Sequence, residues 1–118
     1  MGLQCLDFIV EDLKTGKTAG NCGFTKIDLP HKIGVFGLII HHEFWGKGLA
    51  AECHLLCLDY AFSELNLHRI EFTTFTDNMR MRGFFEKVGI KFESEKKENY
   101  VQDGQYKNTA EYLSLIHI

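Results

Sequence analysis

The sequence predicts a single α/β (α+β) domain whose elements follow the order β-β-β-α-β-α-β-β. The length of 118 residues allows one domain, over residues 1–118, with a core of ordinary size. Short apolar and aromatic segments, separated by turns with glycine or aspartate, occupy both ends of the chain. Between them lies one long segment with helical periodicity, at residues 48–65.

The first third of the chain predicts three strands, at residues 7–11, 19–28 and 33–40. A polar turn at residues 12–17 separates the first two strands, and Pro30 interrupts the chain before the third. Because turns this short join antiparallel neighbours, we expect consecutive antiparallel pairs here.

The segment at residues 48–65 has the clearest helical pattern. Its apolar side chains fall in two adjacent stripes, one of Leu49, Cys53, Leu56 and Tyr60 and one of Leu55, Leu58, Phe62 and Leu65. Glu52, Asp59 and Ser63 mark the polar side. An apolar surface this wide predicts a helix that packs across one face of a sheet.

The remaining elements are a strand at 69–76, a short helix at 79–88 and two strands at 90–101 and 105–115. Asn78 is a suitable N-cap for the short helix, and Gly89 a suitable terminator. Asp103-Gly104 lies between the last two strands and predicts a tight hairpin.

The composition argues against several kinds of partner. The chain has 13 basic and 16 acidic residues, a formal net charge of −3, which does not favour a nucleic-acid or membrane partner. No apolar run approaches the length of a membrane span, and residues 1–5 lack the pattern of a signal peptide. We therefore expect a cytoplasmic protein.

The four cysteines, Cys5, Cys22, Cys53 and Cys57, show no C-x-x-C spacing. We interpret them as structural thiols and expect no metal site, and no nearby base makes any of them a candidate nucleophile.

The segment at residues 38–52 contains the candidate ligand-binding residues. It predicts a strand, a tight turn with Gly46 and Gly48, and the start of the long helix. Glycines let successive N–H groups converge on an anion, the helix dipole adds partial positive charge, and Lys47 adds a full charge. The expected ligand carries phosphates.

Two other phosphate-binding motifs fit this turn less well. The pattern G-x-x-x-x-G-K-[ST] fails, because His41 and Gly48 stand at two decisive places. The dinucleotide pattern G-x-G-x-x-[GA] is met by Gly46, Gly48 and Ala51, with Glu71 about twenty residues later. However, Glu71 lies near the start of its strand, and hairpins rather than a βαβ unit precede the turn.

The residues Trp45-Gly46-Lys47-Gly48-Leu49-Ala50 resemble the acetyl-CoA motif [QR]-x-x-G-x-[GA] of the GNAT superfamily of N-acyltransferases. Tryptophan in the first place is similar to the RimJ/RimL-like branch, which commonly has W-G-K-G there. The resemblance covers residues 6–115 and continues through the segments at 61–69, 77–78, 85–89 and 101–108. That branch includes enzymes that acetylate protein N-termini and polyamines such as spermidine.

The resemblance implies a mixed, mainly antiparallel GNAT-like sheet and acetyl-CoA as the cosubstrate. The implied cofactor-binding residues are Leu38, Ile39 and Ile40 for the pantetheine arm, Trp45, Gly46, Lys47, Gly48, Leu49, Ala50 and Ala51 for the pyrophosphate, and Asn78. The implied function is acetyl transfer to a primary amine, either a protein N-terminus or a small amine or polyamine. A second copy of the chain, in a homodimer, is a further candidate partner.

The sequence departs from the family at three proton-handling places. Phe85 stands where a tyrosine is usual, Met81 where branch members have a serine, and Val35 where many have a glutamate. The alternative interpretation is therefore a non-catalytic acyl-CoA-binding module or an inactive fragment of such an enzyme.

The remaining candidates for acid–base catalysis are His41, His42 and Glu71, with Glu43 and Tyr106 as further possibilities. A histidine titrates near neutral pH and can serve as a base. The alternative is that the histidines are exposed loop residues and that Glu71 is a surface carboxylate.

Both ends of the chain bear on its completeness. The family begins with a strand and two helices that form most of the acceptor site, and the resemblance here starts at the family's second strand. We therefore expect an N-terminally truncated domain. Residues 113–118 are similar to the translation of a transposon adaptor, so we expect a possible adaptor-derived tail.

Overall fold

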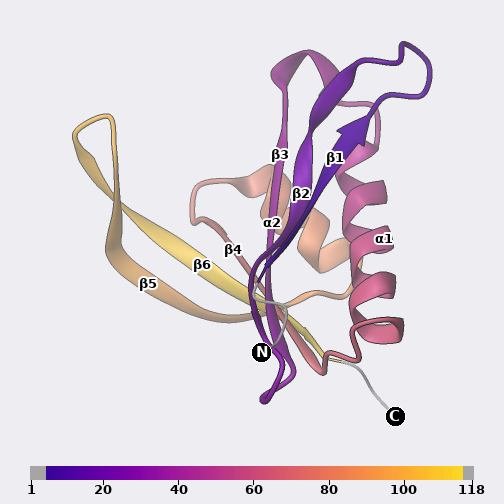
Figure 1. Ribbon diagram of the computed structural model, residues 1–118. Coiled ribbons are helices and arrows are strands. Elements are labelled where there is room, and N and C mark those ends of the chain that lie inside the picture. Colours follow the sequence, from indigo (N-terminus) through magenta and orange to yellow (C-terminus); the bar gives the residue numbers. More distant parts are fainter. Residues whose placement is uncertain (1–4, 116–118) are drawn as a thin grey trace.

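The computed structural model describes residues 5–115 as a six-stranded sheet with two helices (Figure 1). Its elements are β1 (Leu6–Glu11), β2 (Thr18–Asp28), β3 (Ile33–Ile40), the 3-10 helix η1 (His42–Phe44), α1 (Leu49–Ser63), β4 (Arg69–Phe75), α2 (Met79–Lys87), β5 (Lys91–Gln102) and β6 (Gln105–Leu115). Each predicted strand and helix is confirmed with small shifts of its ends. None of the helices within residues 5–115 is long and apolar enough to cross a membrane.

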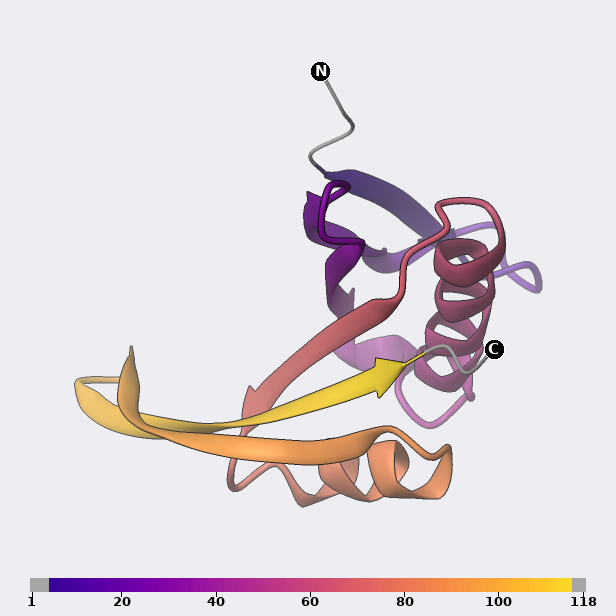
Figure 2. The same cartoon turned by 90° about the horizontal axis from the view of Figure 1, so that it is seen from below.

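The sheet is mixed and mainly antiparallel, in the order β1-β2-β3-β4-β6-β5, which confirms the predicted fold class. Its only parallel neighbours among the described strands are β3 and β4, which pair over three positions, from Ile33–Arg69 to Val35–Glu71. Beyond Val35 the two strands diverge: β3 stays with β2 and β4 stays with β6. The sheet thus consists of two halves joined at a short seam, with a wedge between β3 and β4 (Figure 2).

An aromatic cluster holds both helices against the sheet. The imidazole of His54 on α1 lies 4.7 Å from the Phe36 ring of β3 and 4.8 Å from the Phe84 ring of α2. Phe85 of α2 contacts Phe72 of β4 at 5.4 Å between ring centroids. Rings from four elements therefore form one core, which places α1 and α2 on the same face of the sheet.

The predicted core face of α1 is partly wrong. The buried residues of α1 are Cys53, His54, Cys57 and Ala61, whereas Leu55 and Leu56 are 53% and 63% exposed. Small side chains let the helix lie close to β2, where the Sγ atoms of Cys22 and Cys57 are 3.7 Å apart. The larger leucines then remain outside, although the sequence pattern placed them in the apolar stripes.

The two sequence signals at local turns are confirmed. The Asn78 side chain caps α2 by accepting a hydrogen bond from the Met81 amide at 3.1 Å. Asp103 and Gly104 both have positive φ, 53° and 76°, at the turn between β5 and β6.

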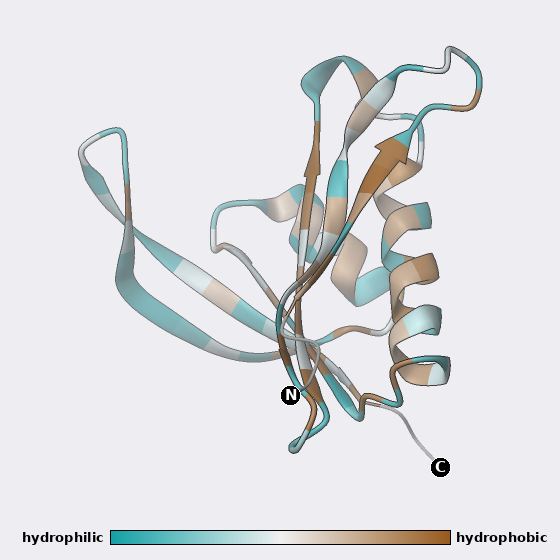
Figure 3. Ribbon diagram, viewed as in Figure 1, coloured by the Kyte–Doolittle hydropathy of each residue, from teal (hydrophilic) through white to brown (hydrophobic). Residues whose placement is uncertain are grey.

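The β5–β6 hairpin extends away from the body of the fold (Figure 1), and Figure 3 shows that β5 is largely hydrophilic. β5 is exposed along its whole length. Of the suspected adaptor tail, residues 113–115 complete β6 and pair with β4. Residues 116–118 lie outside the described residues.

Candidate functional site

The glycine turn lies between η1 and α1 and has the backbone conformation that the motif requires. Gly46 and Gly48 both have φ of 78°, in the left-handed region that favours glycine. A Cβ atom at either position would meet no atom within 4 Å, so the turn faces open space. The Glu52 amide donates to the Gly48 carbonyl as the first helical hydrogen bond. The amides of residues 49–51 therefore have no partner within the helix.

Trp45 lies at the start of this turn and is fixed in place. Its indole Nε1–H donates to the Ile40 carbonyl at 2.8 Å, and its ring packs against His42 at 4.8 Å between centroids. The side chain is nevertheless 55% exposed. Trp45 therefore offers a rigid, accessible aromatic face beside the glycine turn.

Two cations from different elements flank the turn. The Lys47 ammonium lies 5.3 Å from the centroid of the Phe44 ring, and the Arg80 guanidinium of α2 lies 5.9 Å from the Trp45 ring. Neither cation forms an ion pair with any residue between positions 5 and 115. Free amides and unpaired cations together are suited to an anionic group.

The C-terminal half of β3, beyond its pairing with β4, has a free edge on the side of β4. The His41 amide donates to the Ala19 carbonyl of β2 at 2.8 Å, which sets the alternation of backbone groups along the strand. Ile39, paired with Asn21, directs its amide and carbonyl to β2, whereas those of Leu38 point into the wedge. Of the Ile40 groups on this side, the carbonyl is occupied by Trp45.

The same alternation adds the Phe36 carbonyl to the free edge, a position that the sequence analysis did not include, whereas the Phe36 amide belongs to the pairing of Val35 with Glu71. Phe36 is two residues before Leu38, so period-two counting along the strand could have identified it. From Val35 at the seam to Ile40 the strand advances by roughly 17 Å. This edge is long enough for an extended ligand whose phosphates rest on the glycine turn.

The acid–base candidates lie at opposite ends of this edge. His41 and His42 are exposed beside the glycine turn, whereas Glu71 lies at the seam, paired with Val35. The Glu71 carboxylate accepts a 2.8 Å hydrogen bond from Arg69, which also donates to Glu93 at 2.6 Å. These bonds raise the pKa of Arg69, and the bond from Arg69 lowers the pKa of Glu93.

The other candidates are apart from the free edge. Glu43 is exposed in η1, and Tyr106 is 69% exposed near the hairpin turn, where it pairs with Val101. Phe85 is 2% exposed within the aromatic cluster, and Met81 packs against the core. Phe85 and Met81, at two of the three atypical positions, thus contribute packing rather than ionisable groups.

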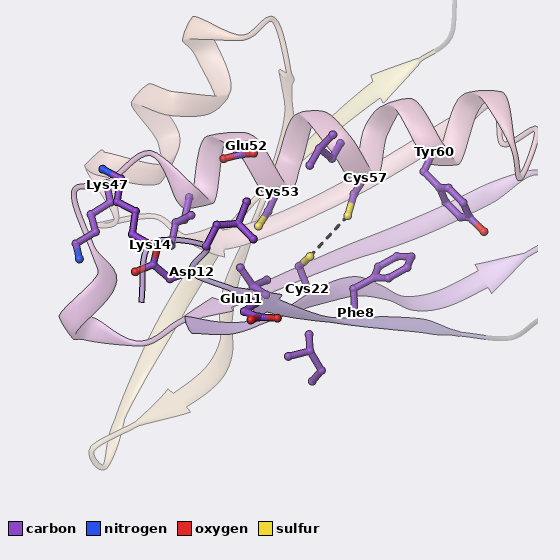
Figure 4. Close-up of a pocket in the computed structure, with 15 residues that line it drawn as sticks. Phe8, Glu11, Asp12, Lys14, Cys22, Lys47, Glu52, Cys53, Cys57 and Tyr60 are labelled. Carbon is purple, nitrogen blue, oxygen red and sulfur yellow. Dashed lines mark hydrogen bonds between the residues drawn. The ribbon is translucent and has the colours of Figure 1, made fainter. Parts of the chain in front are cut away.

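A groove of about 740 Å³ lies between β1 and α1 and extends from Lys47 to Tyr60 (Figure 4). Its lining is mainly apolar and includes the thiols of Cys22, Cys53 and Cys57. Burial raises the pKa of Cys22 to about 11 and that of Cys53 to about 12, so both are protonated at neutral pH. Residues 5–115 contain no cluster of three or more side chains suited to a metal ion.

A free strand edge that ends at a glycine turn and a helix N-terminus is suited to an extended, phosphate-bearing ligand. The family model described as the acetyltransferase (GNAT) domain matches residues 2–91. The chain therefore belongs to the GNAT acetyltransferase family.

Its relatives include two spermidine N(1)-acetyltransferases. The protein from Escherichia coli (strain K12) is 33% identical over 110 residues, which are 93% of this chain and 58% of that relative. The protein from Vibrio cholerae serotype O1 is 31% identical, with 92% of this chain and 62% of the relative covered. The chain thus spans about three fifths of the length of these relatives.

The fold is also similar to solved structures of this group. A dodecameric structure of spermidine N-acetyltransferase from Vibrio cholerae matches with a TM-score of 0.87 and 29% sequence identity. The match covers 92% of this chain and 63% of that chain.

Proposed function

We propose that this chain is the cofactor-binding part of a cytoplasmic N-acetyltransferase that moves an acetyl group from acetyl-CoA to a primary amine. The observation that carries the proposal is the free β3 edge that ends at the turn of Gly46 and Gly48. Membership of the acetyltransferase (GNAT) family supports acetyl-CoA as the cosubstrate.

In this proposal the pyrophosphate of acetyl-CoA rests on the amides from Gly46 to Ala51, after Trp45, whose own amide is bonded to the His42 carbonyl, with Lys47 as a counter-charge. The pantetheine arm extends along β3, where the Leu38 amide and carbonyl and the Ile40 amide take the place of a neighbouring strand. Asn78 already caps α2, so its carboxamide is partly engaged. The thioester then lies toward the seam, near Val35 and Glu71.

This arrangement argues for a simple mechanism in which a neutral amine attacks the thioester carbonyl. The C–N bond forms, the C–S bond breaks, and the proton lost from the amine passes to the leaving CoA thiolate directly or through water. His41 and His42 lie at the phosphate end of the edge, and Glu71 is bound to Arg69. At pH 7, deprotonating an α-amine of pKa near 8 costs about 1.4 kcal/mol, whereas an amine of pKa near 10.4 costs about 4.6 kcal/mol. Without a strong base, we propose that a protein or peptide N-terminus is the better acceptor, with a polyamine as the other candidate.

The test begins with binding. Acetyl-CoA and desulfo-CoA are titrated calorimetrically, and saturable binding of both is expected. A thiol-release assay with a peptide N-terminus, spermidine and lysine follows. Turnover above the hydrolysis rate supports the enzyme, binding without turnover supports the non-catalytic module, and no binding at high micromolar concentration rejects both.

We also propose that the chain self-associates through its exposed apolar face. Leu55 and Leu56, adjacent on α1, are 53% and 63% exposed. Apolar groups gathered on a surface favour association. Light scattering after size exclusion is expected to give a dimer or larger species, and a Leu56→Glu variant is expected to shift the population to monomer. A monomeric wild-type chain contradicts this proposal.

A further inference from the structure

Arg80 occupies an electrostatically unfavourable place in the fold. It is the second residue of α2, where the positive end of the helix dipole disfavours a cation, and the first turn of α2 contains no acidic residue. It is exposed, and it forms no ion pair among residues 5–115. A local arrangement that opposes stability in this way indicates a functional constraint.

The other arginine of α2 shows the contrast. Arg82 donates to the Tyr112 hydroxyl at 2.9 Å and to the Thr76 carbonyl at 2.8 Å, so its guanidinium is used within the fold. Arg80 instead lies over the ring of Trp45, the residue before the first glycine of the turn, at 5.9 Å from the ring centroid. Its hydrogen-bond donors therefore remain available next to Trp45.

Trp45 explains why a second cation is needed there. It stands at the motif position where glutamine or arginine is usual, and its only side-chain donor is already bonded to Ile40. Trp45 therefore adds no donor and no charge to a phosphate. The Arg80 guanidinium, stacked on the same ring, supplies both from a different element.

We propose that Arg80 is a phosphate ligand for the nucleotide end of the CoA substrate, held in position by the face of Trp45. The inference rests on the proposed binding of acetyl-CoA at this turn. Arg80 and Lys47 then contact the phosphates from two sides, and binding relieves the unfavourable charge at the start of α2.

The test compares acetyl-CoA with 3′-dephospho-acetyl-CoA in calorimetric titrations of the whole chain. Arg80→Gln is expected to weaken acetyl-CoA binding at least about fivefold. Lys87→Gln removes the same charge from the exposed last turn of α2, and we expect it to change affinity less than about twofold. Arg80→Lys keeps the charge and is expected to retain part of the lost affinity. The melting temperature of Arg80→Gln is expected not to fall.

The ligand comparison identifies the phosphate. If Arg80→Gln loses affinity for acetyl-CoA alone, Arg80 is assigned to the 3′-phosphate. If it loses affinity equally for both ligands, Arg80 is assigned to the pyrophosphate. Either result supports the proposal. Unchanged affinity of a folded Arg80→Gln variant for both ligands overturns it. If the wild-type chain binds neither ligand, the proposed function itself fails.

Discussion

Replacing Gly48 tests the anion site most directly. Gly48 has φ of 78° and open space around the position of a Cβ, so any side chain there strains the backbone without a steric clash. The left-handed conformation costs a non-glycine residue about 1–2 kcal/mol of stability. Gly48→Ala and Gly48→Glu share this strain. They differ in the negative charge that the glutamate places beside the phosphates.

The magnitude of that difference follows from Coulomb's law. At about 5 Å, a carboxylate repels one phosphate charge by about 1–3 kcal/mol for effective dielectric constants between those of water and a protein surface. This corresponds to about a five- to 150-fold loss of affinity per phosphate charge. We therefore expect Gly48→Glu to bind acetyl-CoA at least about tenfold more weakly than Gly48→Ala.

The affinities of these variants can be measured by the intrinsic fluorescence of the chain. Trp45 is the only tryptophan of the sequence and lies beside the turn, so its fluorescence reports binding there. Gly104→Glu is the matched control, because Gly104 also has positive φ and open space but lies at the hairpin turn. Equal affinities of folded Gly48→Glu and Gly48→Ala would refute the placement of phosphates on this turn.

Three further predictions concern stability. Burial lowers the pKa of His54 below its usual 6.5, so the stability it confers is complete above pH 6.5 and is lost as the pH falls toward the lowered pKa. When unfolding in urea is measured across that pH range, the free energy of unfolding is expected to change by at most about 1.4 kcal/mol per pH unit. This slope is expected to be smaller in His54→Phe but not in the variant of the exposed residue, His31→Gln. Identical pH profiles of the wild-type chain and His54→Phe would contradict the prediction. Phe85→Ala leaves a cavity in the aromatic cluster and is expected to lower the free energy of unfolding by about 3–5 kcal/mol, a prediction that a loss below about 1 kcal/mol would disprove. Asn78→Ala removes the cap bond to Met81 and is expected to cost about 1 kcal/mol, whereas Asn78→Asp is expected to retain most of it.

The elements of the fold could be predicted because their signals are local. Asn78 caps α2 through a residue three positions away, and Asp103-Gly104 turns the hairpin through its own backbone angles. The glycine turn is equally local, since the positive φ of Gly46 and Gly48 lies within a few residues of the helix that follows.

The inner face of α1 could not be predicted with the same rule. Counting apolar residues placed Leu55 and Leu56 in the stripes that pack on the sheet, yet the structure buries His54 and exposes both leucines. The buried face depends on which side chains fit between helix and sheet. That fit depends on Phe36 and Phe84, which are distant in sequence from His54.

The sequence by itself determined the order of the elements and the position of the glycine turn before the long helix. These properties follow from periodicity, turn chemistry and residue types within short windows. Only the tertiary structure decided which backbone groups of β3 face the wedge, that Glu71 is tied to Arg69, and that Arg80 lies against Trp45. Each of these depends on strand register or on the packing of elements that are remote in the chain. No short sequence pattern encodes contacts between residues so far apart.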